Sequence, residues 1–179
     1  CARLNDGTAR CWGGNGYGEL GDGTNLLRST PVAVSGLADV IEIAAGFEHT
    51  CARLDDATLR CWGRNDGGQL GDNSTIRRLT PVAVSDLSSV AEIAAGGDYT
   101  CARLTGGRVR CWGYNYSGQL GDGTTTLRPT PVTVSGLAGV VEIAAGSAHT
   151  CARLSDATVR CWGNNGNGQL GDGSTTNRH

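Results

Sequence analysis

Residues 40–75 read VIEIAAGFEHTCARLDDATLRCWGRNDGGQLGDNST, and closely similar stretches return at residues 90–125 and 140–175. The CARL segment inside them begins at Cys1, Cys51, Cys101 and Cys151, so the sequence has a period of 50 residues. A fixed period of this length is typical of solenoids, propellers and other arrays in which each unit buries its apolar face on a neighbour. The repeat boundaries are residues 1–50, 51–100, 101–150 and a partial repeat at 151–179.

Each repeat contains four short runs that suit β-strands, and no helical period competes with them. In the clearest unit these runs are P-V-A-V, V-I-E-I-A-A-G, H-T-C-A-R-L and T-L-R-C-W-G. The first run opens on Pro31, which lacks a backbone donor and suits the start of an edge strand. The second run shrinks to alanine and glycine, which fits sheets that crowd toward a common axis. The sequence therefore predicts an all-β fold, a β-propeller of four-stranded antiparallel blades.

The run V-x-E-I-A-A-G-x-x-H-T-C-A-R-L-x-D-x-T-V-R-C-W-G-x-N-x-x-G-Q-L-G-D-G-T closely resembles the regulator of chromosome condensation repeat over essentially the whole chain. The resemblance implies a seven-bladed propeller with the I-A-A-G strand innermost and the P-V-x-V strand outermost. Members of that family include a nucleotide exchange factor for a small GTPase, a plant ultraviolet sensor and a secreted bacterial inhibitor of β-lactamases. Because a fold does not fix a function, the resemblance leaves the activity open.

Counting the expected strands gives 14, or about three and a half blades. The sequence begins inside a repeat motif and stops before the next T-P-V segment. We therefore expect an excerpt of a longer propeller, in which further repeats complete the ring or a partner covers each end. An open arc would otherwise leave unpaired strand edges in water.

Eight cysteines recur in pairs with a constant spacing, namely Cys1 and Cys11, Cys51 and Cys61, Cys101 and Cys111, and Cys151 and Cys161. If the turn between them is a type I turn with a bulge at Gly7, the two cysteines of a pair lie directly opposite each other. Facing Cα atoms at such a site are ~4.5 Å apart, which a disulfide can bridge. We therefore predict four cross-strand disulfides and an extracellular or cell-surface location.

Two alternatives to these disulfides stay open. Ala57 and Ala157 replace the turn glycine, although a positive φ is costly for alanine, and a different turn would place the cysteines on opposite faces. The cysteines would then be free buried thiols. A zinc site that recruits His49 or His149 is the other alternative, but the spacing is unusual for zinc and Tyr99 replaces the histidine in one repeat.

Composition and motifs exclude several classes of function. All 15 basic residues are arginine, they are dispersed, and the net charge is −2, so we expect no nucleic-acid partner. No run of ~18 apolar residues is present, so we expect no membrane span. The sequence has no nucleophile elbow, phosphate loop, cofactor fingerprint or calcium-loop spacing. These observations favour a protein without catalytic residues, cofactor or metal.

Residues that recur in every repeat are better explained as architecture than as an active site. We predict that the tryptophans form the core between blades and that the inner-strand glutamates are buried partners of arginines. The histidines are expected to be structural, and the G-D aspartates to make hydrogen bonds within their loops. The predicted structural residues are Trp12, Trp62, Trp112, Trp162, Glu42, Glu92 and Glu142.

Function is better sought where the repeats differ. In a four-stranded meander alternate connections lie on the same side, so the A-A-G-x-x-H connection should share a face with the long loop after C-W-G. Aromatic and charged residues on these connections suit protein recognition, although drift in solvated loops is an alternative explanation. Two N-x-S/T patterns, at Asn73 and Asn115, also lie in these loops. The candidate binding face consists of Phe47, Glu48, Asp98, Tyr17, Arg64, Tyr114 and Tyr116.

The leading hypothesis is a non-enzymatic interaction module, secreted or on the cell surface, that binds a protein or glycan partner through this face. The alternative is a structural building block of an extracellular oligomer or filament, which light scattering would reveal as a concentration-dependent polymer. An exchange-factor-like regulator is a third hypothesis. It is disfavoured because every complete repeat keeps to 50 residues and none carries the projecting insertion that the exchange factor uses.

Overall fold

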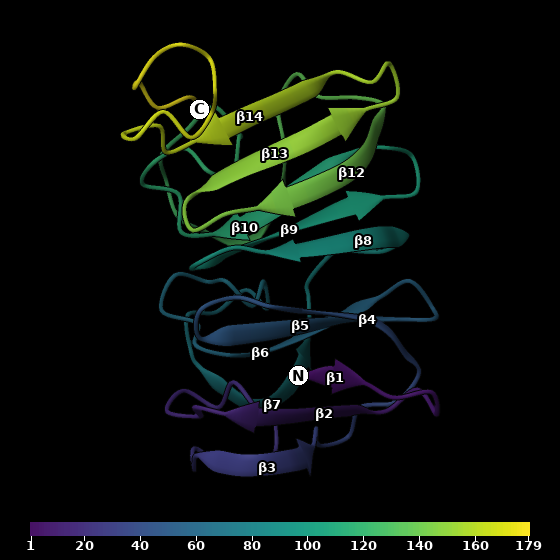
Figure 1. Ribbon diagram of the computed structural model, residues 1–179. Helices are drawn as coiled ribbons and strands as arrows, with labels where there is room; N and C mark the ends of the chain where they lie inside the picture. Colours follow the sequence, from purple (N-terminus) through teal and green to yellow (C-terminus); the bar gives the residue numbers. More distant parts are fainter.

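The computed structural model describes residues 1–179 as 14 β-strands in four sheets that follow one another from the N-terminus to the C-terminus (Figure 1). The two central sheets have four antiparallel strands, in the orders β4-β5-β6-β7 and β8-β9-β10-β11. The first sheet holds β1 to β3 and the last holds β12 to β14. We call these sheets blades 1 to 4. They form about three and a half blades of a β-propeller, which confirms the predicted fold class.

Each complete blade contains the four strands that the repeat predicts. Blade 1 contains β1 (Ala2–Arg3), β2 (Ala9–Gly13) and β3 (Arg28–Ala33). Blade 2 contains β4 (Val40–Ala45), β5 (His49–Leu54), β6 (Leu59–Gly63) and β7 (Arg78–Ala83). Blade 3 contains β8 (Val90–Ala95), β9 (Tyr99–Leu104), β10 (Val109–Gly113) and β11 (Arg128–Thr133). Blade 4 contains β12 (Val140–Ala145), β13 (His149–Leu154) and β14 (Val159–Gly163).

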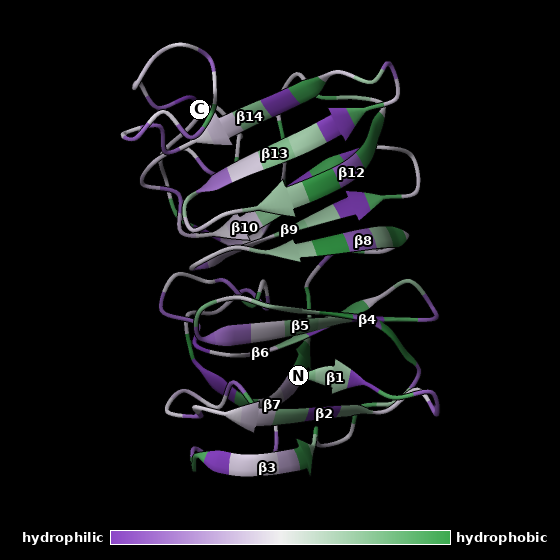
Figure 2. Ribbon diagram, in the orientation of Figure 1, coloured by the Kyte–Doolittle hydropathy of each residue, from purple (hydrophilic) through white to green (hydrophobic).

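The V-x-E-I-A-A strands lie at the inner edge of the blades. Strand β8 contacts both β4 and β12, so these three strands are neighbours, while the T-P-V strands β7 and β11 end their sheets on the outer side. Figure 2 shows hydrophobic residues along inner strands such as β8 and β12, with hydrophilic residues in the connecting loops. The structure contains no helix that is long and apolar enough to cross a membrane.

Each cysteine pair joins two neighbouring strands of one blade. Cys51 of β5 lies directly opposite Cys61 of β6, their Cα atoms are 4.1 Å apart, and a disulfide joins them. The other three pairs are bonded in the same way and no cysteine is free. The prediction of cross-strand disulfides is therefore confirmed.

The turn between the paired cysteines keeps its shape even where alanine replaces glycine. Gly7 has φ 77°, and Ala57 and Ala157 adopt 61° and 68° in the same left-handed region. The Asp56 carboxylate accepts hydrogen bonds from the backbone N–H and the hydroxyl of Thr58, at 2.9 and 2.6 Å. This Asx-type turn stabilises the tight connection and offsets the strain at alanine, so the cysteine register is preserved.

The hydrophobic core lies between neighbouring blades rather than within one sheet. At the first junction, Leu20 of blade 1 packs with Trp62 of blade 2. The indole N–H of Trp62 donates a hydrogen bond to the Glu19 carbonyl of blade 1, at 2.9 Å. Trp112 and Trp162 make the same bond to the preceding blade, also at 2.9 Å. The repeated tryptophan therefore joins blades by both packing and hydrogen bonding.

The core prediction is wrong for Trp12. This side chain is 46% exposed, whereas Trp62 and Trp112 are fully buried and Trp162 is 7% exposed. The physical reason is that no blade precedes blade 1 in this structure, so the carbonyl that accepts the indole N–H at the other three junctions is not present for Trp12. Burial at this repeat position depends on the neighbouring blade and not on the residue itself.

The glutamate prediction needs a smaller correction, because these side chains are only partly buried. Arg53 donates to Glu42 at 2.7 Å, and the second carboxylate oxygen of Glu42 accepts the N–H of Ile93 in the next blade at 3.2 Å. Glu92 repeats this arrangement one blade further on. The side chain of Glu142 is 58% exposed because no blade follows blade 4 in this structure. The glutamates thus link blades rather than lie within a core.

Candidate binding face

Two kinds of loop form one side of the propeller. The N–H of Arg64, in a long loop, donates to the carbonyl of Glu48 in an inner loop at 2.7 Å, and Tyr114 donates to Asp98 in the same way at 3.0 Å. The inner and long loops therefore share a side, as the meander predicts. We call this side the loop face; it consists of inner loops 46–48, 96–98 and 146–148 and long loops 14–27, 64–77, 114–127 and 164–177.

Each long loop is held in place by a buried asparagine. Asn65 is fully buried; its side-chain nitrogen donates to Asp72 at 3.0 Å and its oxygen accepts the N–H of Leu70 at 3.0 Å. Burial alone would raise the pKa of Asp72, but hydrogen bonds from Ser74 and Arg78 outweigh it and lower the pKa. The G-D aspartates thus make hydrogen bonds within their loops, and the loop face is a rigid platform.

Arg64 lies at the centre of a charged cluster on this face. Its guanidinium is 2.8 Å from Glu48, 2.8 Å from Asp66 and 3.6 Å from Asp98. The same guanidinium lies over the ring of Tyr17, 5.3 Å from the centroid. The structure therefore brings together four predicted face residues from three blades, and adds Asp66. We call these five residues the Arg64 cluster.

The Arg64 cluster has more negative than positive charge, because three carboxylates surround one guanidinium. The hydrogen bond to Asp66 raises the pKa of Arg64, and the bond to Glu48 adds to it against the effect of burial. The pKa of Asp98 is raised above its ordinary value, mainly by burial. The positive charge of Arg64 opposes this shift, and the negative charge of Glu48 adds to it. Asp98 Oδ1 is buried and has no hydrogen-bond donor. One carboxylate oxygen of the cluster thus has no hydrogen bond and only a 3.6 Å ion pair with Arg64.

Phe47 adds an apolar element beside this cluster. Its side chain is 70% exposed. The N–H of Phe47 donates to the Gly97 carbonyl at 3.2 Å, and the N–H of Gly97 donates to Ser147 at 3.1 Å, so the inner loops of three blades are joined by backbone hydrogen bonds. These loops line a recess of about 230 Å³ whose other lining residues are alanine, glycine and Ser147. The exposed ring of Phe47 is thus an apolar element beside a recess of small residues.

In blades 2, 3 and 4 the first residue of the long loop contacts the long loop of the preceding blade, and each contact has a different chemistry. Arg64 lies over Tyr17. Tyr114 packs on Gly67 so closely that a Cβ atom there would overlap the ring. Tyr114 also lies 5.5 Å from the 72% exposed Tyr116. The two predicted tyrosines thus form a second group, over the junction between blades 2 and 3.

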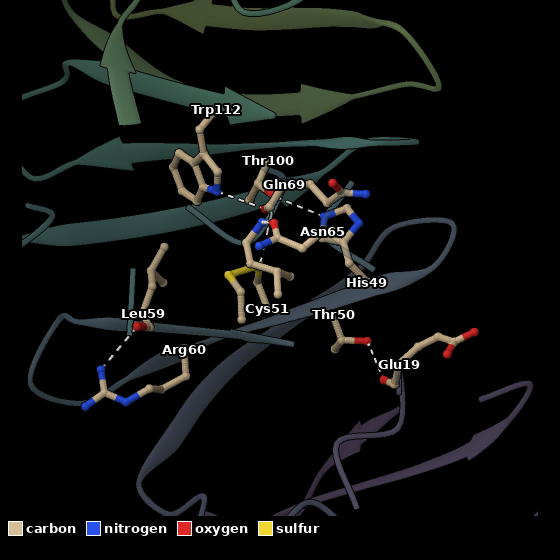
Figure 3. Close-up of a disulfide and its surroundings, with 12 residues drawn as sticks. Glu19, His49, Thr50, Cys51, Leu59, Arg60, Asn65, Gln69, Thr100 and Trp112 are labelled. Carbon is tan, nitrogen blue, oxygen red and sulfur yellow. Dashed lines mark hydrogen bonds between the residues drawn. A yellow bond between two sulfur atoms is a disulfide. The ribbon is translucent and has the colours of Figure 1, made fainter. Parts of the chain in front are cut away.

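A buried polar network underlies the face near the Cys51 disulfide (Figure 3). The Thr100 hydroxyl donates to the Gln69 carbonyl at 2.9 Å, so it accepts at 2.9 Å from Nε2–H of His49. The Nδ1 of His49 is buried without a hydrogen-bond partner. Burial lowers the pKa of His49 to about 4, so the ring is neutral near pH 7. These contacts fit the predicted structural role of this histidine.

The predicted binding face leaves out two acidic residues. Asp66 belongs to the Arg64 cluster, and Glu19 accepts the N–H of Tyr17 at 2.8 Å. Comparison of the repeats identifies Asp66 as a variable residue of its long loop. The same comparison could have found Glu19, since glutamine replaces it in the other three copies.

The two N-x-S/T patterns differ in accessibility. Asn115 is fully buried, and its side-chain nitrogen donates to Asp122 at 3.1 Å and to the Thr124 carbonyl at 3.0 Å. That nitrogen is therefore inaccessible in the folded protein. Asn73 is exposed, with φ 60° at a position where the other repeats have glycine. The preference of asparagine for this left-handed conformation explains its presence there.

The repeated sheets and their junctions define a tandem-repeat β-propeller. Models of the regulator of chromosome condensation (RCC1) repeat match residues 6–53, 58–103 and 106–153, and a second version matches residues 40–69, 90–119 and 140–169. Because these matches extend over more than half of the chain, it belongs to the RCC1 repeat family. No curated protein sequence gives a significant match.

Solved structures show the same fold. Human WBSCR16 is 26% identical with a TM-score of 0.83, over 98% of this chain and 48% of that one. Yeast RCC1 (Prp20) bound to Kap60 is 22% identical with a TM-score of 0.81, over 96% and 43%. A structure of Prp20p from Saccharomyces cerevisiae, described with its binding to Gsp1p and histones, is 22% identical with a TM-score of 0.81, over 96% and 44%. The chain thus spans less than half the length of each.

Proposed function

We propose that this chain is a non-enzymatic interaction module that works outside the cell or on its surface and binds a protein partner through the loop face. The observation that carries the proposal is one non-repeated cluster on a repeated scaffold. Glycine, tyrosine and asparagine replace Arg64 in the other copies, so the Arg64 cluster occurs once. Blade architecture does not require such a cluster, because the other blades form without it. A cluster of this kind on exposed loops therefore supports a role in recognition.

The chemistry of the loop face supports a protein partner. Phe47 and Tyr116 are exposed aromatic residues, and arginine and tyrosine residues lie between them. Aromatic and arginine side chains on a rigid support are the residue types that dominate protein–protein interfaces. Yeast RCC1 (Prp20), which has the same fold, was crystallised bound to a protein, Kap60, and this agrees with a protein partner.

The disulfides support an extracellular location. Four disulfides in a chain of this length are typical of oxidising compartments. Intact-mass measurement of the protein from its natural source, before and after reduction, tests this part of the proposal. A gain of eight hydrogens is expected, since the chain has eight paired cysteines. No mass gain would contradict the extracellular location.

Site-specific cross-linking tests the binding face. A photo-reactive amino acid replaces Phe47 in the full-length protein in its natural surroundings, and the matched control carries it at Thr105. Thr105 is an exposed residue in the hairpin turn between β9 and β10, on the opposite side. We expect a discrete protein adduct from position 47 and none from position 105. Equal adducts from both positions, no adduct, or an adduct that glycosidases remove would contradict a protein-binding loop face.

A further inference from the structure

We propose that the loop face holds a cationic side chain of its partner, an arginine or lysine that stands beside an apolar residue in the partner chain. The cation would bind at Asp98 and Glu48, and the apolar residue would pack on Phe47 and the recess beside it. This inference rests on the proposed function and specifies the chemistry of the partner.

The charge balance around Arg64 selects a cation. Glu19, Glu48, Asp66 and Asp98 carry four negative charges, and Arg64 carries one positive charge, which leaves −4 + 1 = −3. A surplus of one sign on a rigid surface attracts and orients groups of the opposite sign. An acidic partner would meet repulsion from the same residues.

Two partly exposed carboxylates give the cation a specific position. The side chains of Glu48 and Asp98 are 36% and 35% exposed, and both lie beside the guanidinium of Arg64, at 2.8 and 3.6 Å. Asp98 is the less fully paired of the two, because its Oδ1 faces Arg64 without a hydrogen-bond donor. A charged N–H donor satisfies a carboxylate more strongly than a neutral one, so this pair favours an arginine or lysine N–H over a hydroxyl.

The apolar element lies next to both carboxylates along the chain. Phe47 precedes Glu48, and a Cβ atom at Gly97, the residue before Asp98, would lie 3.4 Å from the ring of Phe47. The ring and the recess of about 230 Å³ offer space for an aliphatic group. A long basic side chain has an apolar stem and a charged head, so it matches both elements.

Peptide binding tests this inference with defined probes. The probe is a short fluorescent peptide of alternating arginine and leucine, and its binding to the full chain is measured by anisotropy at low salt. A second peptide has citrulline in place of arginine, which keeps the shape and removes the charge. A third has serine in place of leucine. We expect the arginine–leucine peptide to bind about tenfold more tightly than either.

Matched variants assign the binding to the loop face. The double variant Glu48→Gln/Asp98→Asn should weaken binding of the arginine–leucine peptide about tenfold. The control Asp55→Asn/Asp86→Asn makes the same change of charge in exposed turns on the opposite side, and should leave binding unchanged. Phe47→Ala should weaken binding several-fold, and because this ring is 70% exposed, the variant keeps the test valid if the double variant does not fold.

The outcomes separate this inference from the proposed function. Equal binding of the citrulline peptide, an equal loss in the control, or unchanged binding by the double variant would each overturn the cationic partner. If a protein cross-links at position 47 and its binding is insensitive to Glu48→Gln/Asp98→Asn, the inference fails and the proposed function stands. Absence of any cross-linked protein would contradict both the inference and the proposed function.

Discussion

His49 should make the folded protein sensitive to mild acid, and substitution by tyrosine should remove that sensitivity. The pKa of His49 is lowered from 6.5 to about 4 by burial. The unfolded chain therefore binds a proton at a pH where the folded chain does not. The free energy of unfolding is unaffected by this group above pH 6.5, falls as the pH drops from 6.5 toward 4, and levels off below 4.

The magnitude follows from the size of the shift. One pH unit between the two pKa values corresponds to about 1.4 kcal/mol, so the free energy of unfolding should fall by about 2 kcal/mol between pH 6.5 and pH 5. The structural reason is that Nε2–H already donates to Thr100, so a second proton would go to Nδ1, which has no buried acceptor. The charged ring would be both desolvated and unpaired.

The chain supplies its own matched control for this experiment. Tyr99 occupies the equivalent position in blade 3, its hydroxyl hydrogen-bonds to the backbone of His149, and Gly96 makes room for the ring just as Gly46 does for His49. His49→Tyr should therefore fold and lack the acid-dependent loss. Urea unfolding of both proteins between pH 7 and pH 5, followed by tryptophan fluorescence, gives the difference. Parallel pH profiles, or a His49 NMR titration near its ordinary pKa, would refute the reasoning.

Three further predictions concern stability and are checked by urea unfolding under non-reducing conditions. Ala57→Gly should raise the free energy of unfolding by about 0.5–1 kcal/mol, because φ is 61° there; a lower value would contradict the strain. Trp112→Phe should cost about 2 kcal/mol through a lost hydrogen bond and a cavity, whereas Trp12→Phe should cost under about 0.5 kcal/mol; equal losses would refute the junction argument. Alanine at both Cys101 and Cys111 should cost about 3 kcal/mol, because the disulfide closes a loop with a sequence separation of 10; an unchanged midpoint would oppose it.

The blades could be predicted from the sequence because the same pattern of strands and turns recurs in every repeat. Strand order, the opposed cysteines and the tight turn follow from residues within one repeat, such as Cys51 and Cys61 with a sequence separation of 10. Ala57 argued against this turn because a positive φ is unfavourable for alanine. The turn is nevertheless kept, because the Asx-type turn at Asp56 holds the same geometry. Local chemistry repeated at a fixed period is thus a sufficient basis for this fold.

The environment of individual residues was less predictable because it depends on the neighbouring blade. Trp12 and Trp62 have the same local sequence, C-W-G, yet one is 46% exposed and the other fully buried. Glu142 differs from Glu42 for the same reason. The contact between Arg64 and Tyr17 joins two repeats, so neither repeat alone indicates it. Contacts across a junction cannot be deduced from one repeat alone.

The division between repeated and non-repeated residues also explains how this scaffold can carry recognition without losing stability. The repeated residues make the junctions: the tryptophan bonds one blade to the next, and the asparagine holds each long loop. The variable loop residues contact one another above these junctions: Arg64 lies over Tyr17, and Tyr114 packs on Gly67. Substitutions there alter charge and shape on the loop face while the bonds beneath remain. The chemistry of the loop face is therefore set by the pairing of unlike loops across similar junctions.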